Sequence, residues 1–260
     1  MHRVPAPTCP GRVRLTAGLF TLGALGIAGA APRRAAAQMP ESPAASGAEQ
    51  EEVPHPFFTH MGIPEGRGVF NLRASALSTR ADGRQVGDFA FHLETGITER
   101  IGLHIRNDQF IAVPRTEAMF QFAAVMSKDG MSGFAPLIEF NFPTRSGAGR
   151  RVNTLAGYTV ALVNPRVSFN HVVHYDPRED GGDASAALVT RVAGRFFPVI
   201  EVLGEGGRGM RPIANLLAGL KLRVREGVNV GLAYQVPITS NKDFASQVVA
   251  QPDYEWSFRR

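Results

Sequence analysis

Apolar and polar residues alternate with a period of two along most of this chain. In residues 88–96 the apolar side chains Phe89, Phe91 and Leu93 occupy every second position. Such alternation is typical of β-strands that have one apolar and one polar face. Twelve segments show it, namely 69–80, 88–96, 100–107, 118–126, 134–142, 154–162, 167–175, 186–193, 198–203, 216–224, 229–236 and 247–258. We therefore predict an all-β domain of about twelve strands.

The connections between these segments alternate between short and long. Short turns are expected near 97–98, 128–130, 164–165, 195–196 and 226–227, and longer polar loops over 81–87, 109–115, 144–152, 176–183, 206–212 and 238–244. An even number of strands with short turns at one end and longer loops at the other is the pattern of outer-membrane barrels. The sequence therefore predicts a transmembrane antiparallel up-and-down β-barrel in the outer membrane of a Gram-negative bacterium, with both termini in the periplasm.

A water-soluble β-sandwich is the alternative, because its strands also alternate apolar and polar residues. Two features favour the barrel. Charges of both signs recur on the polar faces, and aromatic residues lie near the ends of the apolar faces, as expected at the two membrane interfaces. The predicted interface aromatics are Phe142, Tyr158, Tyr175, Tyr234, Tyr254, Trp256 and Phe258.

The polar faces of the strands would line the lumen. Twelve strands enclose more space than an eight-stranded barrel and less than a sixteen-stranded porin, so we expect a narrow lumen that side chains, an inward loop or the leader fill in part. The predicted lining residues are His92, Glu94, Arg100, His104, Arg106, Glu139, Arg191, Glu201, Lys221, Arg223, Asp253 and Glu255. These charges would either pair to stiffen the wall or form a selectivity surface for a polar or amphipathic solute.

The first residues have the three parts of a secretory signal. Arginines precede a small-residue apolar run over 15–31, and Ala35-Ala36-Ala37 offers a cleavage site. An uncleaved membrane helix is the alternative reading of this run. Residues 38–56 contain almost no large apolar side chains, so we expect a disordered periplasmic leader there. The domain prediction is a signal peptide over 1–37, this leader over 38–56 and the barrel over 57–260.

Loss of the signal changes the charge and the cysteine count. The whole chain has 28 basic and 23 acidic side chains and a formal charge of +5. Five of the arginines lie within residues 1–37, which contain no acidic residue, so the mature chain would hold 23 charges of each sign. Its neutrality gives no reason to expect nucleic-acid binding. The single cysteine, Cys9, also leaves with the signal, and this excludes disulfides and thiolate metal sites from the mature chain.

The histidines raise the question of a metal site. His92 and His104 occupy inward positions on neighbouring predicted strands, whereas His171 and His174 differ by three and face opposite sides of one strand. No carboxylate stands at a telling spacing from them, so the expectation is no metal site and no cofactor.

The C-terminal part resembles a known family. The residues concerned are Gly219-Leu220-Lys221-Leu222-Arg223, Gly231-Leu232-Ala233-Tyr234-Gln235-Val236-Pro237, Lys242-Asp243-Phe244 and Tyr254-Glu255-Trp256-Ser257-Phe258. Over about residues 210–258 the chain is similar to the outer-membrane barrels of the MetA pathway of phenol degradation. The resemblance implies a transporter-like channel for hydrophobic or aromatic compounds. It also implies recognition by the barrel-assembly machinery through a terminal aromatic, although Arg259 and Arg260 follow Phe258 here.

The expected function is a channel or transporter-like barrel for small hydrophobic or amphipathic solutes, with outer-membrane lipid, the assembly machinery and the solute as partners. One alternative is an outer-membrane lipid hydrolase, which needs a serine nucleophile beside a histidine base. His171 faces outward by the alternation, but Ser168 faces inward, and the chain has no G-x-S-x-G motif. We therefore predict no enzyme activity. The other alternative is a structural barrel that does not conduct.

Overall fold

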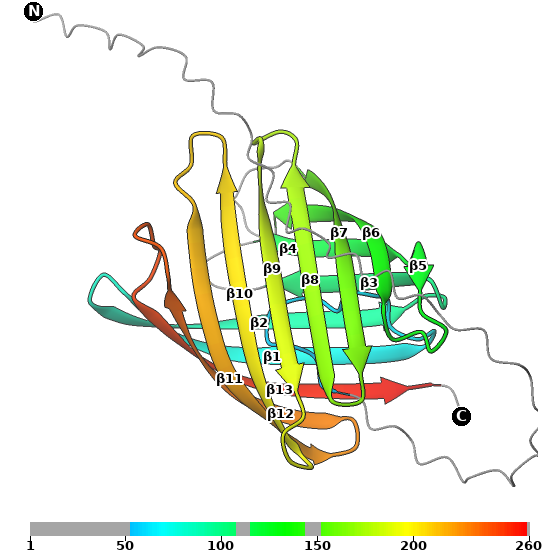
Figure 1. Cartoon of the computed structure of the whole chain (residues 1–260). Helices are drawn as coiled ribbons and strands as arrows, with labels where there is room; N and C mark the ends of the chain where they lie inside the picture. The colour runs from blue at the N-terminus through cyan, green and yellow to red at the C-terminus, as the bar shows by residue number, and fades with distance from the viewer. Residues whose placement is uncertain (1–52, 108–114, 144–151, 259–260) are drawn as a thin grey trace, which may run out of the picture. The chain divides into compact units, whose positions relative to one another are not determined.

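The computed structural model describes residues 53–107, 115–143 and 152–258, and most of these residues belong to β-strands (Figure 1). The strands are β1 Val69–Ala81, β2 Arg84–Gly96, β3 Ile101–Asn107, β4 Arg115–Phe122, β5 Val125–Met126, β6 Gly133–Pro143, β7 Asn153–Asn164, β8 Val167–Asp176, β9 Gly181–Thr190, β10 Phe196–Gly207, β11 Ile213–Arg225, β12 Val228–Pro237 and β13 Ser246–Ser257. Across the described ranges, no helix combines the length and the apolar character needed to cross a membrane. The predicted signal peptide, residues 38–52 and the two terminal arginines lie outside the described residues.

The strands form one closed antiparallel barrel. Strands that follow one another in sequence pair, except β4 and β5, which both pair with β6, and β1 pairs with β13. The short β5 also pairs with β6 and continues the wall strand that β4 begins, after an irregularity at residues 123–124. The described wall is therefore twelve strands around, which confirms the predicted fold.

One predicted loop is a tight turn in the structure. Residues 81–87 belong mostly to the hairpin of β1 and β2, whose pairing continues to Ala81 opposite Arg84. The turn consists of Asp82 and Gly83, both with positive φ (48° and 74°). Asp-Gly is the usual sequence for a two-residue turn of this kind, because both central residues must adopt positive φ. The alternation is weak over 84–88, so the second strand was predicted to start at residue 88, whereas β2 begins at Arg84.

The two faces of the wall differ sharply in character. On β12, Leu232 and Tyr234 are more than half exposed on the outside, while Ala233 and Gln235, which alternate with them, are buried. Large exposed apolar side chains recur in this way around the barrel, and a belt of that extent is stable only against lipid or another apolar partner. The predicted interface aromatics all lie on this outer face. Trp256 is less exposed than the others, because it stacks between Phe70 and Tyr254.

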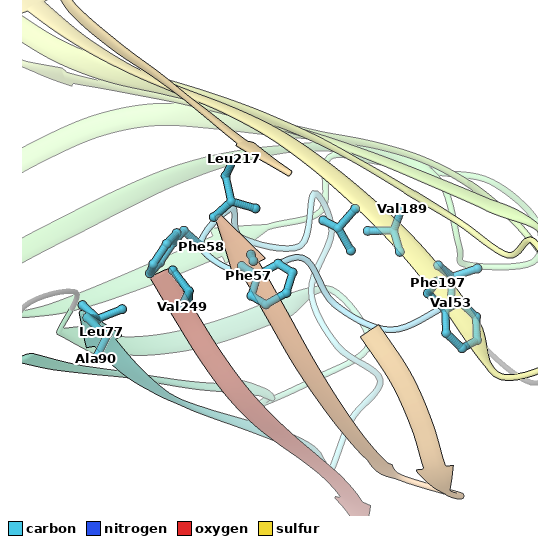
Figure 2. Packing of buried hydrophobic residues seen from close by; sticks show 11 residues of the cluster. Val53, Phe57, Phe58, Leu77, Ala90, Val189, Phe197, Leu217 and Val249 are labelled. Atoms are coloured by element: carbon cyan, nitrogen blue, oxygen red, sulfur yellow. The ribbon is translucent and has the colours of Figure 1, made fainter. Parts of the chain in front are cut away.

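The segment that precedes β1 occupies much of the barrel interior. Residues 53–64 are all buried, and we call residues 53–65 the plug. Figure 2 shows Val53, Phe57 and Phe58 of the plug among apolar side chains of the wall, including Leu77, Val189, Phe197, Leu217 and Val249. Residues 53–56, which were predicted to belong to a disordered leader, are thus packed against the wall. Their composition alone did not indicate order, because most of their partners lie on distant strands.

Candidate functional site

The wall binds the backbone of the plug through polar side chains. Glu201 on β10 accepts hydrogen bonds from three consecutive backbone N–H groups, those of Phe57, Phe58 (3.1 Å) and Thr59 (2.9 Å), and also from the Thr59 hydroxyl. The Glu201 side chain is completely buried. A buried carboxylate without partners is very costly, so these donors hold Glu201 and the plug together.

Cationic and amide side chains bind the plug carbonyl groups. Arg73 on β1 donates to the carbonyl oxygen of Pro56 at 2.9 Å and reaches those of Phe57 and Thr59 at 3.4 and 3.3 Å. Gln251 on β13 donates to the Phe57 carbonyl at 2.8 Å. Backbone groups that would be orphaned in an irregular buried segment are satisfied in this way.

The second half of the plug is bound by the opposite part of the wall. Asn170 on β8 accepts from the N–H of Gly62 at 2.8 Å, and Thr159 on β7 donates to the Gly62 carbonyl at 2.7 Å. Gln121 on β4 donates to the Met61 carbonyl at 2.8 Å. A Cβ atom at Gly62 would lie 2.1 Å from the backbone oxygen of Val160, so the plug contacts the wall here without space for a side chain.

Two inward glycines form a recess for Phe57. A Cβ at Gly219 would lie 2.7 Å from the Phe57 ring, and one at Gly231 would lie 2.8 Å from it. The ammonium group of Lys221 lies 5.0 Å from the centre of the same ring. Phe57 is fully buried, and it is therefore a principal apolar contact between plug and wall.

Three pairs of opposite charges lie on the inner face, buried or partly buried. Arg73 binds Glu94, Arg106 binds Glu117, and Lys221 lies 2.7 Å from Asp253. Pairs of this kind stiffen a lumen and are costly to separate. For these residues, the pairs favour the interpretation that the lumen charges stiffen the wall over the interpretation that they form a selectivity surface.

His55 joins both ends of the plug to the wall. Its Nε2 lies 2.9 Å from Glu65, and its Nδ1 lies 3.1 Å from Glu94 on β2. Burial alone would lower the pKa of His55, but the two carboxylates outweigh it and raise the pKa to about 10. His55 is therefore a cation at neutral pH.

A cluster of histidines lies between the plug and the wall. His60 of the plug stacks on His92 and meets His104 and His174 edge-on, with ring centroids 6.0, 5.1 and 6.1 Å away. Burial, helped by the charge of Arg106, holds the pKa of His60 well below its ordinary value. Four imidazoles from four separate segments thus meet in the lumen.

The predicted lining residues occupy several environments. His92, Glu94, His104, Glu139, Glu201, Lys221 and Asp253 are buried on the inner face, and Arg106 and Glu255 are partly buried there. Arg191 and Arg223 flank the buried Phe197 ring at 5.5 and 5.0 Å. Arg100 differs, because it is exposed in the turn between β2 and β3 and donates to the Ala123 carbonyl. The polar alternation continues past the end of the strand, so it does not mark where the enclosed lumen stops.

Sequence reasoning missed several residues that hold the plug. Arg73, Gln121, Thr159, Asn170 and Gln251 were not predicted to line the lumen, although each occupies an inward position of a predicted strand. The alternation that identified the strands could have found them. His174 was considered only together with His171. Its proximity to the plug could not be predicted, because the plug has no periodic sequence pattern.

A cavity of about 540 Å³ lies beside the plug, toward the end of the barrel that carries the longer loops. Phe58 contributes to it from the plug, and the described wall adds both apolar and charged side chains. Its lining includes Arg106, Glu117, Asp183, Leu203, Ile213, Gln235, Asp243 and Phe244. The mixture suits a ligand that has an apolar body and a polar group.

The two residues considered for a lipid hydrolase do not meet. Ser168 is buried on the inner face and accepts a hydrogen bond from Asn170. The ring of His171 is turned to the outer face, where its Nδ1 lies 3.0 Å from the Ser185 carbonyl oxygen and the ring packs on Tyr158. These two residues therefore form no nucleophile–base pair.

Comparison with solved structures finds barrels of the outer membrane. The NanC porin aligns with a TM-score of 0.50 and 9% identity over 74% of this chain and 100% of that chain. The KdgM porin aligns equally well over 74% of this chain and 99% of its own. An outer membrane channel from Pseudomonas putida F1 aligns at 9% identity and a TM-score of 0.50 over 82% of this chain and 100% of that one.

This chain has the fold of outer-membrane porins and channels. At 9% identity the similarity concerns the fold and not the solute. Comparison with protein-family models and with curated proteins finds no match.

Proposed function

We propose that this protein is a bacterial outer-membrane channel, closed by its own plug, that passes small hydrophobic or amphipathic solutes. The observation that carries the proposal is a lumen occupied by a loop that wall side chains hold through hydrogen bonds. A barrel whose interior needed only to be filled would be packed most simply with apolar side chains. When the plug moves, the polar groups of the interface between plug and wall can instead form hydrogen bonds with water.

The arrangement of the plug supports a gate. His55 and Glu65 bind each other, so the loop enters and leaves at the same end of the barrel, where β1 begins. A loop of this kind can withdraw without any break in the wall. The cavity next to Phe58 would then receive the solute from the other end.

Separate observations support the proposed location and the proposed kinship. The exposed apolar belt supports a position in the outer membrane, with lipid around the wall. The sequence similarity over residues 210–258 supports kinship with the channels of the MetA pathway of phenol degradation. That kinship favours an aromatic or hydrophobic solute and insertion by the barrel-assembly machinery.

Planar-bilayer recording tests the channel. We expect the mature wild-type chain to give rare openings, the Glu201→Gln variant to open more often, and a variant without residues 53–64 to conduct continuously. Glu226→Gln is the matched control, because Glu226 is exposed in the turn between β11 and β12. Folding of every variant is checked by the difference in gel mobility between heated and unheated samples.

The same material tests the solute. Liposomes that contain the plug-deleted chain should swell faster in benzoate than in arabinose, because the cavity next to the plug offers apolar and charged contacts. A correctly folded, plug-deleted barrel with no conductance would establish the structural barrel instead.

A further inference from the structure

Three potential metal ligands from the plug and two wall strands converge in the lumen. His60 belongs to the plug, Glu139 to β6 and His174 to β8, and one donor atom of each lies within 4.8 Å of the other two. All three side chains are at least 98% buried. Buried groups of this kind in natural proteins are nearly always paired or ligated.

Each of the three side chains has one donor atom without a hydrogen-bond partner. His60 Nε2, His174 Nε2 and Glu139 Oε2 are all buried and unsatisfied, and the last two lie 3.4 Å apart. Ligands about 2.1 Å from one tetrahedral ion lie about 3.4 Å from each other. The distance from His174 to Glu139 already has this value, and the donor atom of His60 lies within 4.8 Å of both.

The partner of His174 leaves its Nε2 available as a ligand. Asp183 lies 2.8 Å from His174 Nδ1, and a carboxylate can only accept, so Nδ1 carries the proton. In the neutral ring Nε2 then has a lone pair. A carboxylate behind a histidine is the usual outer partner at metal sites, where it orients the ring and increases its basicity. Asn141 similarly donates to Glu139 Oε1, which leaves Oε2 for the site.

A chain of hydrogen bonds orients His60 in the same way. Gln121 donates its amide to the Met61 carbonyl, so its oxygen accepts from His104 Nε2 at 2.8 Å. His104 Nδ1 then accepts from His60 Nδ1 at 3.2 Å. This leaves the lone pair of His60 on Nε2, the nitrogen that has no hydrogen-bond partner.

The backbone makes space for the site. Strand β7 separates β6 from β8, and it places Gly157 opposite His174 in the register. A Cβ at Gly157 would lie 1.8 Å from the Val173 carbonyl oxygen. The wall between Glu139 and His174 therefore has no side chain at that point.

Two neighbouring groups are less suitable. In the group of His60, Glu94 and His104, the Glu94 oxygen that faces the histidines already binds Arg73. In the group of His55, Glu65 and Glu94, the histidine is a cation paired with both carboxylates. A protonated imidazole cannot ligate a metal.

We propose that His60, Glu139 and His174 bind one divalent transition-metal ion such as Zn²⁺, and that this ion joins the plug to the wall. Two imidazoles and a carboxylate suit such ions, and the fourth position is open to water. The ion would replace the unsatisfied contacts by bonds across β6, β8 and the plug. The inference does not depend on solute passage, because it concerns the closed form of the barrel.

Metal analysis of the purified chain tests the proposal. The untagged mature chain in detergent is treated with a chelator, equilibrated with Zn²⁺ and analysed by mass spectrometry for bound metal. We expect one ion per chain, and loss of that ion in His174→Ala and Glu139→Gln. His171→Ala is the matched control, because His171 lies on the same strand but faces outward. Asp183→Asn should weaken the affinity about 10–100-fold.

A second measurement does not depend on these variants. Hydrogen exchange of residues 57–62 in the wild-type chain should slow when Zn²⁺ is added and recover when it is chelated. Absence of stoichiometric Zn²⁺ in the folded wild-type chain would overturn the proposal. Retention of the ion by folded His174→Ala together with its loss in His104→Ala would also overturn it, in favour of the group around Glu94.

Discussion

His55 Nε2 lies 2.9 Å from Glu65 Oε1, and this contact joins the two ends of the plug. The second nitrogen of the same ring reaches Glu94 on β2, so one imidazole ties both ends of the loop to the wall. Because all three groups are largely buried, the stability of the docked plug depends on the charge of His55.

The charge of His55 predicts a dependence on pH. The pKa rises from 6.5 to about 10 when the plug is docked, so this residue stabilises docking fully below pH 6.5. The contribution decreases as the pH rises from 6.5 and is lost above about 10, because the docked form binds the proton more tightly than the released form. We expect proteolysis within residues 53–65 to become faster over this range.

Replacement of His55 tests whether this residue is the cause. His55→Gln should release the plug more readily near neutral pH and remove most of the pH dependence over the same range. His171→Gln on the outer face should behave like the wild type. An unchanged pH profile in His55→Gln would show that another group controls docking.

Filling the recess for Phe57 should expel the ring. Gly231→Val places atoms within van der Waals contact of Phe57, and overpacking of this kind costs about 1–3 kcal/mol. Amide exchange in the plug should accelerate about 10–100-fold. Gly87→Val is the control, because a Cβ at Gly87 has nothing within 4 Å. Equal exchange in the two variants would argue against Phe57 as a main contact.

Removal of one partner from the Lys221–Asp253 pair should destabilise the barrel. Lys221→Ala leaves Asp253 buried without its cation and should cost about 3–5 kcal/mol in the free energy of unfolding. The double variant Lys221→Met/Asp253→Leu should recover most of that loss. Denaturation by urea, followed by circular dichroism, measures both values. If the single and double variants unfold alike, the buried charge is not the cause.

The single tryptophan reports the position of the membrane. Trp256 lies on the outer face, stacked between Phe70 and Tyr254 near the end of β13. In lipid vesicles, its fluorescence should be quenched more by nitroxide labels near the headgroups than by labels near the bilayer centre. Quenching by aqueous acrylamide alone would place this face in water.

The wall could be predicted from sequence because every strand carries its own evidence. In β2, Phe89, Phe91 and Leu93 alternate with inward residues. Every wall strand needs one apolar face, so an apolar residue recurs at every second position. Seven of the predicted lining residues are fully buried inside for this reason. Arg100 shows the limit, since alternation does not reveal where a strand ends.

The plug could not be predicted in this way. Its residues have no period, and Pro54 and Pro56 suggest an irregular segment. Its order comes from Glu201, Arg73 and Gln251, which are at least 14 residues away in sequence. The meeting of His60 with His174 follows from that docking, so nothing in the local spacing of the histidines could indicate it.

The shared entry point of the two ends of the plug bears on how the protein is made. Because residues 53–65 fold back toward the start of β1, this loop can enter the lumen without passing through the wall. The hydrogen bonds between β1 and β13 can therefore close the cylinder first, while its interior is still wet. We therefore expect insertion of the loop to be the last step of biogenesis, and a newly made barrel to have a wet lumen until that step is complete.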